Sequence, residues 1–266
     1  MFNRKLVTSA LLCGAMVASP DALPGWYPDS MVALGDSITR ATLADNSVGG
    51  VSDGQPEHSW ATGYDSRDGV RSHYERILAE DPTIKGHYWN LAESGAKADD
   101  LPGQARAAVK TGAEYVVILM GANDVCAEEA SRMTTTDAFR YQYEQALETL
   151  TDGLPEATIV VAAVPRVRRV YDVGGGDFFC RVKWSIFQWC DNVLRNGSTQ
   201  RYQADARNIE YNNALLDLSA DYGVIYDDGP FVWQFEQGNL SEIDCFHPDL
   251  SGQRGLAEMT FDDGRF

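Results

Sequence analysis

The sequence has little positive charge, no internal repeat and no Cys-x-x-Cys pair. Lys and Arg number 22 against 39 Asp and Glu, so the net charge is −17. A chain this acidic is repelled by a phosphate backbone, which excludes general nucleic-acid binding. The lack of a repeat of fixed period excludes solenoids and propellers. Without Cys-x-x-Cys spacing, neither a zinc site nor a thiol oxidoreductase is expected.

The N-terminus has the layout of a secretory signal peptide. Arg4 and Lys5 precede a mostly apolar stretch, residues 6–18, which is too short to span a membrane as a mature helix. We therefore predict a signal peptide over residues 1–18 and a secreted, periplasmic or extracellular mature chain. A lipid anchor on Cys13 is the alternative, but the residue before this cysteine is Leu12 rather than the usual small residue.

Apolar runs rich in β-branched residues alternate with helical patterns along the rest of the chain. The predicted strands are 31–34, 88–92, 115–120, 158–164 and 223–226, and the predicted helices are 69–81, 101–112, 134–153, 201–223 and 247–261. This alternation predicts an α/β three-layer sandwich with a central parallel sheet of about five strands. We expect a single domain over residues 19–266, with an insert at 165–200 that does not fit the alternation.

Polar clusters follow the predicted strands, at the edge of the sheet where parallel α/β proteins bind ligands. They are Gly35-Asp36-Ser37 after the first strand, Gly95 after the second, Asn123-Asp124 after the third, and Asp244 with His247 before the last helix. All four clusters are expected to meet at one rim.

These residues are the parts of an acyl-transfer site. Ser37 can act as nucleophile and His247 as general base, while Asp244 orients the imidazole and stabilises its cation. The Asn123 amide and the backbone N–H groups of Gly95 and Ser37 can form an oxyanion hole. Two further acidic residues, Asp36 and Asp124, can support the site without contacting the substrate. Asp36 can support the turn that presents Ser37, and Asp124 can hydrogen-bond behind the site or cap a helix.

The motifs Gly-Asp-Ser-Ile, a second-block glycine, Gly-x-Asn-Asp and Asp-x-x-His, in this order over residues 31–248, resemble the signature of the SGNH (GDSL-type) hydrolases. The resemblance implies a flavodoxin-like α/β/α fold. It also implies ester cleavage by a triad of Ser37, His247 and Asp244, with Gly95 and Asn123 in the oxyanion hole. One departure is Ala122, where glycine is common.

The chain is most similar to the phospholipase B-like branch of this family, in segments 82–86, 90–106 and 121–126, in Asp-Cys-Phe-His-Pro-Asp and in the cysteine-containing insert. That resemblance implies a lipid ester as substrate, met at a membrane or micelle surface. The resemblance implies no metal, organic cofactor or obligate protein partner, and a monomer is expected. The alternatives are a short-chain or carbohydrate acetyl esterase on the same scaffold, and an inactive lipid- or glycan-binding module. The intact proton relay argues against the inactive module.

The insert is basic and aromatic in an otherwise acidic chain. Residues 165–201 contain seven basic and three acidic residues with aromatic residues between them. We predict that Arg166, Arg168, Arg169 and Trp184 bind substrate, because arginine suits an anionic headgroup and tryptophan suits an interface. The alternative is a structural loop with internally paired charges.

Four cysteines follow the predicted signal peptide: Cys126, Cys180, Cys190 and Cys245. An even number in an exported chain predicts disulfides, with three possible pairings. Position favours Cys180–Cys190 as a local staple of the insert. Cys126–Cys245 would then join the Asn123 segment to the His247 segment.

Overall fold

Five parallel strands form one sheet in the order β2-β1-β3-β4-β5. The computed structural model describes residues 27–47 and 54–266, so the predicted signal peptide lies outside the described residues. The strands are β1 (Met31–Gly35), β2 (Tyr88–Asn90), β3 (Tyr115–Leu119), β4 (Thr158–Ala162) and β5 (Ile225–Asp227). β1 and β3 pair along their whole length, with Gly35 opposite Leu119.

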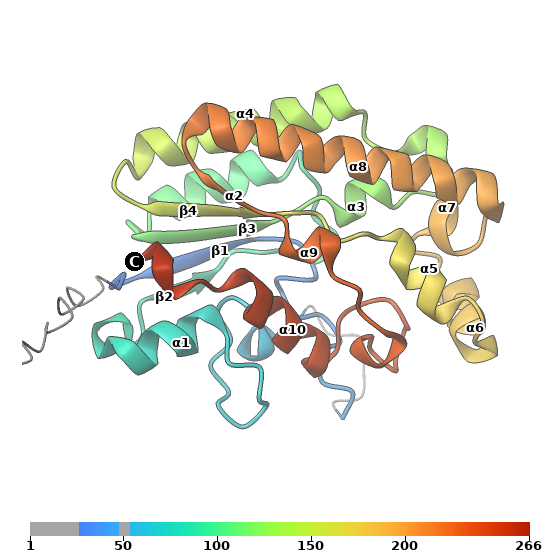
Figure 1. Cartoon of the computed structure of the whole chain (residues 1–266), viewed down its shortest axis with the longest axis horizontal. Coiled ribbons are helices and arrows are strands. Elements are labelled where there is room, and N and C mark those ends of the chain that lie inside the picture. The colour runs from blue at the N-terminus through green and yellow to red at the C-terminus, as the bar shows by residue number, and fades with distance from the viewer. Residues whose placement is uncertain (1–26, 48–53) are drawn as a thin grey trace, which may run out of the picture.

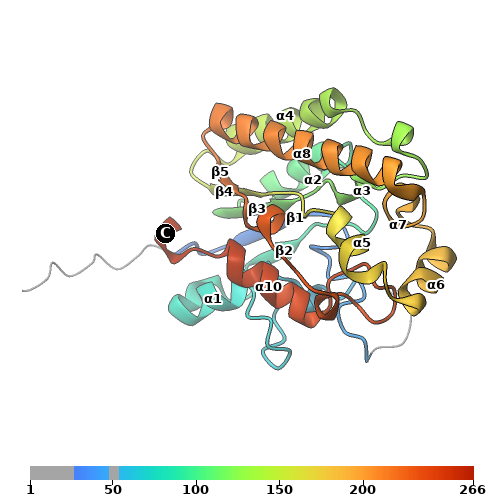
Figure 2. The same cartoon turned by 45° about the vertical axis from the view of Figure 1, so that its right-hand side comes forward.

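Helices cover both faces of this sheet (Figures 1 and 2). One face carries α2 (Leu101–Val109), α4 (Thr136–Gly153) and α8 (Gly197–Tyr222), and the other carries α1 (His73–Glu80) and α10 (Leu250–Thr260). Val116 and Ile118 of β3 face the first layer, whereas Tyr115 and Val117 face the second. Because alternate side chains of a strand point to opposite faces, β3 is buried on both sides. The predicted three-layer α/β/α sandwich is confirmed.

Capping residues mark the ends of three of the helices, α1, α4 and α8. Ser72 and Glu75 form a capping box at the start of α1, and the Thr135 hydroxyl accepts the Ala138 N–H at the start of α4. α8 ends where Gly223 adopts φ +65°. Its first residue, Gly197, lies four positions before the predicted start. Short 3-10 turns occupy Pro56–His58, Pro82–Ile84, Ala130–Arg132, Gln237–Asn239 and Asp263–Arg265.

The insert at 165–200 is helical. It contains α5 (Arg168–Gly174), α6 (Phe178–Phe187) and α7 (Asp191–Leu194), which Figures 1 and 2 place beyond the carboxyl ends of the strands. The remaining short helices are α3 (Ala122–Val125) after β3 and α9 (Gly229–Val232) after β5. No helix within residues 27–47 and 54–266 is long and apolar enough to cross a membrane.

The disulfides connect Cys126 to Cys190 and Cys180 to Cys245, with Cα–Cα distances of 4.5 and 5.4 Å. The predicted pairs, Cys180–Cys190 and Cys126–Cys245, are therefore wrong. The reason is α6, because Cys180 lies in its first turn and Cys190 lies beyond its end. A helix rises about 1.5 Å per residue, so Cys180 lies roughly 10 Å from Phe187 at the end of α6, whereas a disulfide needs Cα atoms within about 7 Å.

Candidate active site

The segment after β1 presents Ser37 at the carboxyl end of the sheet. Gly35 has φ +152°, and a Cβ atom there would lie 2.4 Å from the Leu119 carbonyl oxygen of β3. Only glycine therefore fits where β1 ends. The chain then turns, with the Arg40 N–H donating to the Asp36 carbonyl and the Thr42 N–H donating to the Ser37 carbonyl, both at 2.9 Å. The sequence Gly-Asp-Ser thus ends a strand and begins a turn that holds the hydroxyl at the rim.

Ser37, His247 and Asp244 form one hydrogen-bonded chain. The Ser37 Oγ lies 2.9 Å from His247 Nε2, and His247 Nδ1 lies 2.6 Å from Asp244 Oδ2. The other oxygen of Asp244 accepts the backbone N–H groups of Phe246 and His247 at 2.9 and 3.1 Å. An ionised carboxylate only accepts, so Nδ1 carries a proton and Nε2 is left to accept from the Ser37 hydroxyl. The structure brings these three predicted residues together, and all three are buried.

The loop that carries His247 is tied to the Ser37 turn by main-chain and amide contacts. The Leu250 N–H donates to the Ala44 carbonyl at 3.0 Å. On α10, the Gln253 amide donates to the Ile38 carbonyl at 2.9 Å. These contacts join segments more than 200 positions apart in the chain, which fixes His247 relative to Ser37.

Three donors were predicted to form the oxyanion hole, and the structure shows which of their N–H groups are available. The N–H groups of Gly95 and Ser37 have no hydrogen-bond partner among the described residues. The Asn123 amide donates one N–H to the Ala96 carbonyl at 2.9 Å, which leaves its second N–H. Gly95 has φ +84°, but an added Cβ would meet nothing within 4 Å. The backbone conformation, rather than lack of room, requires glycine here.

Two buried acids lie behind these donors. One oxygen of Asp124 accepts the Ala98 N–H at 2.9 Å, so Asp124 holds the segment that follows Gly95. One oxygen of Asp36 accepts the Ile38 N–H at 2.9 Å. The second oxygen of each carboxyl is buried without a hydrogen-bond partner in the described part of the chain. Burial raises the pKa of Asp36 to about 7 and the pKa of Asp124 to about 6.

The sequence did not reveal two side-chain contacts behind Ser37. Gln104 of α2 is buried against the end of β1 and bonds both the N–H and the carbonyl of Gly35. The Thr42 and Ser94 hydroxyls lie 2.7 Å apart, which links the Ser37 turn to the Gly95 segment. A glutamine in an amphipathic helix pattern looks like a surface residue, so no signal marked Gln104.

The predicted substrate-binding residues of the insert have structural partners instead. Arg166 makes a bidentate pair with Asp205 of α8 at 2.7 and 2.8 Å, and Arg168 pairs with the same carboxylate at 3.2 Å. Arg169 donates to the Phe235 carbonyl. Trp184 is 3% exposed, and its indole N–H donates to the Cys245 carbonyl. These contacts favour the alternative of a structural loop with internally paired charges, and substrate binding by these four residues stays a prediction.

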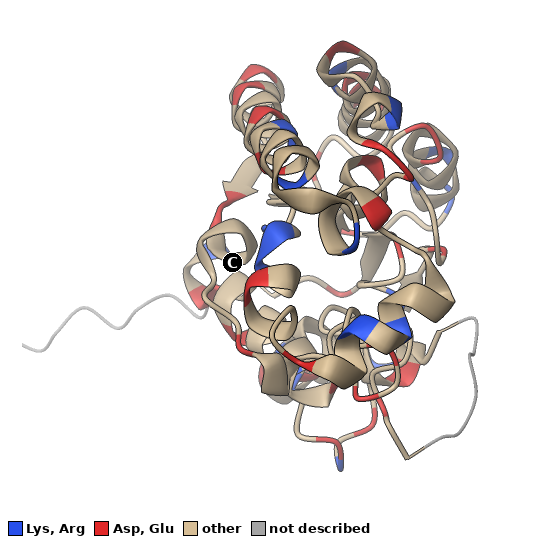
Figure 3. Cartoon of the chain, turned by 90° about the vertical axis from the view of Figure 1, so that its right-hand side faces the viewer, with Lys and Arg blue, Asp and Glu red and all other residues tan. Residues whose placement is uncertain are grey.

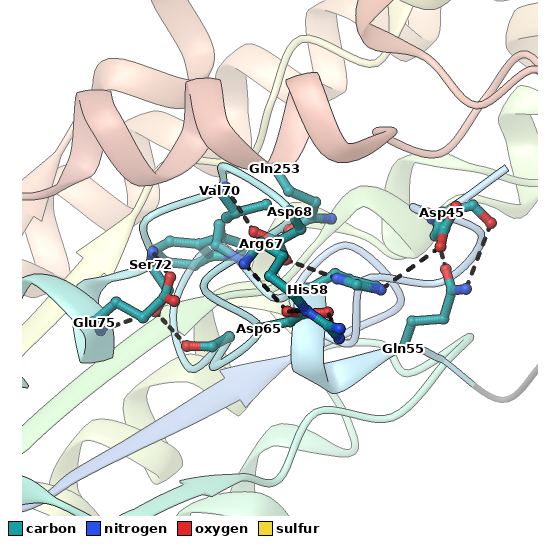
Figure 4. A network of polar contacts seen from close by, with 12 residues as sticks. Asp45, Gln55, His58, Asp65, Arg67, Asp68, Val70, Ser72, Glu75 and Gln253 are labelled. Atoms are coloured by element: carbon teal, nitrogen blue, oxygen red, sulfur yellow. Dashed lines mark hydrogen bonds and ion pairs between the residues drawn. The ribbon is translucent and has the colours of Figure 1, made fainter. Parts of the chain in front are cut away.

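The long loop between β1 and α1 is held by a polar network around a second histidine (Figure 4). His58 Nδ1 lies 2.7 Å from Asp68 Oδ2, and Nε2 lies 4.0 Å from Asp45 Oδ2. Both ring nitrogens therefore face carboxylates of this loop and its neighbouring turn. This histidine shapes the loop beside Ser37, whereas His247 contacts the hydroxyl. No group of three His, Cys, Asp or Glu side chains among residues 27–47 and 54–266 is placed to hold a metal ion.

A three-layer α/β/α sandwich with a hydrogen-bonded Ser, His and Asp at its rim defines the class of hydrolases with a nucleophilic serine. Within this class, the sequence profile of the GDSL-like Lipase/Acylhydrolase family matches residues 33–254, and the chain belongs to that family. At the level of the family, the activity is therefore the hydrolysis of carboxylic esters. The resemblance to SGNH hydrolases is confirmed.

The chain is also similar in sequence to membrane-associated phospholipases. It is 27% identical over 269 residues to membrane-associated phospholipase B1 of Rattus norvegicus and 30% identical over 272 residues to that of Homo sapiens. Each match covers 86% of this chain but only 18% of the relative, so the chain spans less than a fifth of their length.

The structure also resembles two solved proteins that share its fold. One is an extracellular lipase from Streptomyces rimosus, with a TM-score of 0.51 and 20% identity over 86% of this chain and 97% of that chain. The other is a catalytic mutant of an acetylxylan esterase from Geobacillus stearothermophilus, with a TM-score of 0.54 and 15% identity over 88% and 95%.

Proposed function

We propose that this protein is an exported serine ester hydrolase that cleaves carboxylic esters of lipids through an acyl-enzyme. The observation that carries the mechanism is the chain of contacts from Ser37 Oγ to His247 Nε2 at 2.9 Å and from His247 Nδ1 to Asp244 at 2.6 Å. Two disulfides and the signal-like N-terminus support export.

In the acylation step, His247 Nε2 takes the hydroxyl proton as Ser37 Oγ attacks the ester carbonyl carbon. The carbonyl oxygen becomes an oxyanion, which the N–H groups of Ser37 and Gly95 and the free N–H of Asn123 stabilise. Asp244 stabilises the imidazolium that forms. The tetrahedral intermediate collapses when His247 returns the proton to the departing alcohol oxygen, which leaves an acyl group on Ser37.

In the deacylation step, water enters and gives a proton to His247 Nε2 as its oxygen attacks the acyl carbon. A second oxyanion forms at the same donors. Collapse returns the proton to Ser37 Oγ and releases the carboxylic acid, so the enzyme is regenerated without any redox change.

The relatives support a lipid ester as the substrate class. Both named relatives are membrane-associated phospholipases B1, and the similarity runs through 86% of this chain. The product expected from a phospholipid or lysophospholipid is a free fatty acid.

A panel of esters tests both the mechanism and the substrate class. Wild type and Ser37→Ala are given phospholipid, lysophospholipid, triacylglycerol, short p-nitrophenyl esters and acetylated sugars. We expect wild type to release fatty acid from phospholipids, and we expect Ser37→Ala to lose at least about 10³-fold in kcat. Hydrolysis of short or acetyl esters alone would contradict the proposed lipid substrate and would leave the proposed mechanism standing. Full activity of Ser37→Ala would overturn the site.

A carbohydrate acetyl esterase is the second candidate, and one feature favours it. An open groove of about 650 Å³ runs beside edge strand β2 next to the oxyanion segment. Polar side chains contribute much of its lining, among them Asn90, Glu93, Ser94, Asp100 and Gln104. Such a lining suits the hydroxyl groups of a sugar, and the acetylated sugars of the panel test it.

A further inference from the structure

One face of α6 exposes a group of large apolar side chains to solvent. Phe178, Phe179, Val182 and Ile186 are 64, 70, 40 and 69% exposed. At about 100° per residue, these four positions fall within an arc of about 100° on the helix. Exposed apolar residues scattered singly are ordinary, but a contiguous group on one helix marks an interaction surface. We call these four residues the α6 apolar face.

The opposite face of α6 is fixed to the site. Cys180 is disulfide-bonded to Cys245, two residues before His247. The Trp184 indole donates to the Cys245 carbonyl at 3.2 Å, and the Lys183 ammonium donates to the Glu242 carbonyl. The second disulfide, Cys126–Cys190, ties the chain just after α6 to the segment that follows Asn123. The apolar face is therefore held rigidly over the rim rather than on a free arm.

An aromatic side chain leads from this helix to the general base. Trp189 follows α6 and is 38% exposed, and it stacks on Phe187 with ring centroids 4.6 Å apart. The same indole lies edge-on to the His247 imidazole, with centroids 5.2 Å apart. Phe187 and Trp189 thus connect the end of α6 to the imidazole of His247 by direct ring contacts.

The charge of α6 differs from that of the whole chain. α6 contains two basic residues, Arg181 and Lys183, and no acidic residue, in a protein of net charge −17. Neither cation forms an ion pair with another described residue, since their bonds go to the carbonyls of Gly175 and Glu242 and to the Cys245 sulfur. Figure 3 looks onto this end of the molecule, with acidic and basic residues distinguished.

We propose that the α6 apolar face docks on a lipid–water interface whose surface is anionic, and that this docking delivers an ester from the aggregate to Ser37. The inference rests on the proposed function. Aromatic and aliphatic side chains flanked by Lys and Arg are the composition of helices that lie in membrane interfaces. A second copy of this chain fits less well, because a symmetric contact would bring the same unpaired cations together.

Vesicle binding and hydrolysis test the proposal in parallel. The apolar face is altered by Phe179→Ser with Ile186→Ser, and the matched control is Tyr141→Ser with Leu216→Ser, two exposed apolar residues of α4 and α8. Co-sedimentation uses vesicles of phosphatidylcholine with phosphatidylglycerol. We expect the face variant to need at least about tenfold more lipid for half binding and to lose a similar factor of activity on those vesicles. Its kcat/KM on soluble p-nitrophenyl acetate should stay within about twofold, and the control pair should match wild type.

Other results would overturn the proposal. Unchanged vesicle binding by the face variant, or equal loss in the control pair, would do so. The proposal would also be overturned if sedimentation analysis showed that wild type is a dimer and that the face variant is a monomer. Arg181→Glu should weaken binding to anionic vesicles and leave binding to pure phosphatidylcholine unchanged, and the opposite pattern contradicts the anionic surface. Ser37→Ala should bind vesicles like wild type, so a failure of ester hydrolysis is distinguished from a failure of docking.

Discussion

Gln104 holds both polar groups of the Gly35 backbone with one side chain. Its amide oxygen accepts the Gly35 N–H at 2.8 Å, and its amide nitrogen donates to the Gly35 carbonyl at 2.9 Å. Gly35 is the last residue of β1 and lies two positions before Ser37. The helical layer therefore positions Ser37 through one buried amide.

Gln104→Ala should lower kcat by about 10-fold or more and leave KM nearly unchanged, because the turn that aims Ser37 loses its anchor. The free energy of unfolding should fall by about 2 kcal/mol, since the buried Gly35 N–H loses its side-chain acceptor and the Gly35 carbonyl keeps only the Glu93 N–H. Steady-state kinetics and urea unfolding measure the two effects. Gln145→Ala, at a half-buried position of α4 away from the site, is the control. A fall in stability with kcat intact would mean that Gln104 has only a structural role.

Asp244→Asn should reduce kcat on the order of 10⁴-fold. The retained carbonyl oxygen can still accept the Phe246 and His247 N–H groups, so the loop keeps its shape. An amide N–H would face His247 Nδ1 and drive the proton to Nε2, where it cannot accept from Ser37. Thermal unfolding should stay close to wild type. A variant that keeps kcat within tenfold would show that Asp244 does not orient the base.

The contribution of Asp36 to the stability of the protein should fall as pH rises from about 4 to about 7. Burial raises the pKa of Asp36 to about 7 in the folded state, above that of an Asp in the unfolded chain. Between these values the unfolded state has released a proton that the folded state retains, so ionisation favours unfolding. The slope reaches about 1.4 kcal/mol per pH unit for one such group and levels off above pH 7.

Asp36→Asn should remove this part of the slope, because an amide does not ionise. Urea unfolding from pH 4 to pH 8 measures it, with Asp152→Asn, an exposed residue of α4, as the control. Parallel curves for wild type and Asp36→Asn would contradict the raised pKa of Asp36.

Non-reducing tryptic peptide mapping should recover Cys126 with Cys190 and Cys180 with Cys245. Cleavage after Arg181 and Lys183 separates Cys180 from Cys190, so the two pairings give different peptides. The double variant Cys180→Ala/Cys245→Ala opens a link of sequence separation 65, which should cost about 4 kcal/mol of unfolding free energy. Cys126→Ala/Cys190→Ala, of separation 64, should cost a similar amount. A Cys180–Cys190 peptide would contradict the structure.

The sheet could be predicted from the sequence because each strand is a short apolar run between turn residues. All five predicted strands occur, and β3 and β4 differ from prediction only at their ends. The site residues were found because each follows a strand or precedes the last helix, and parallel topology brings those positions together. Asp124 was predicted to hydrogen-bond behind the site, and its bond to Ala98 does so.

The insert could not be predicted in the same way. Its three helices are short, and their pattern is dominated by aromatic residues and glycines. Trp184 and Trp189 look alike in the sequence, yet one is buried under α6 and the other lies against His247. Which face of α6 turns inward depends on Cys245, a residue 65 positions from Cys180. No local signal carries that information, which is why the disulfide pairing was predicted wrongly and why the burial of Trp184 was not anticipated.

The order of the four cysteines along the chain limits how early each disulfide can close. Cys126 and Cys190 are both made before β5, whereas Cys245 follows it. A growing polypeptide can therefore close the first link early, but the second must wait for the segment that also brings Asp244 and His247. Until then Ser37 has no base, and α6 has no anchor at its first turn. Under the proposed function, the chain therefore has a complete proton relay only after residues 244–247 have been made.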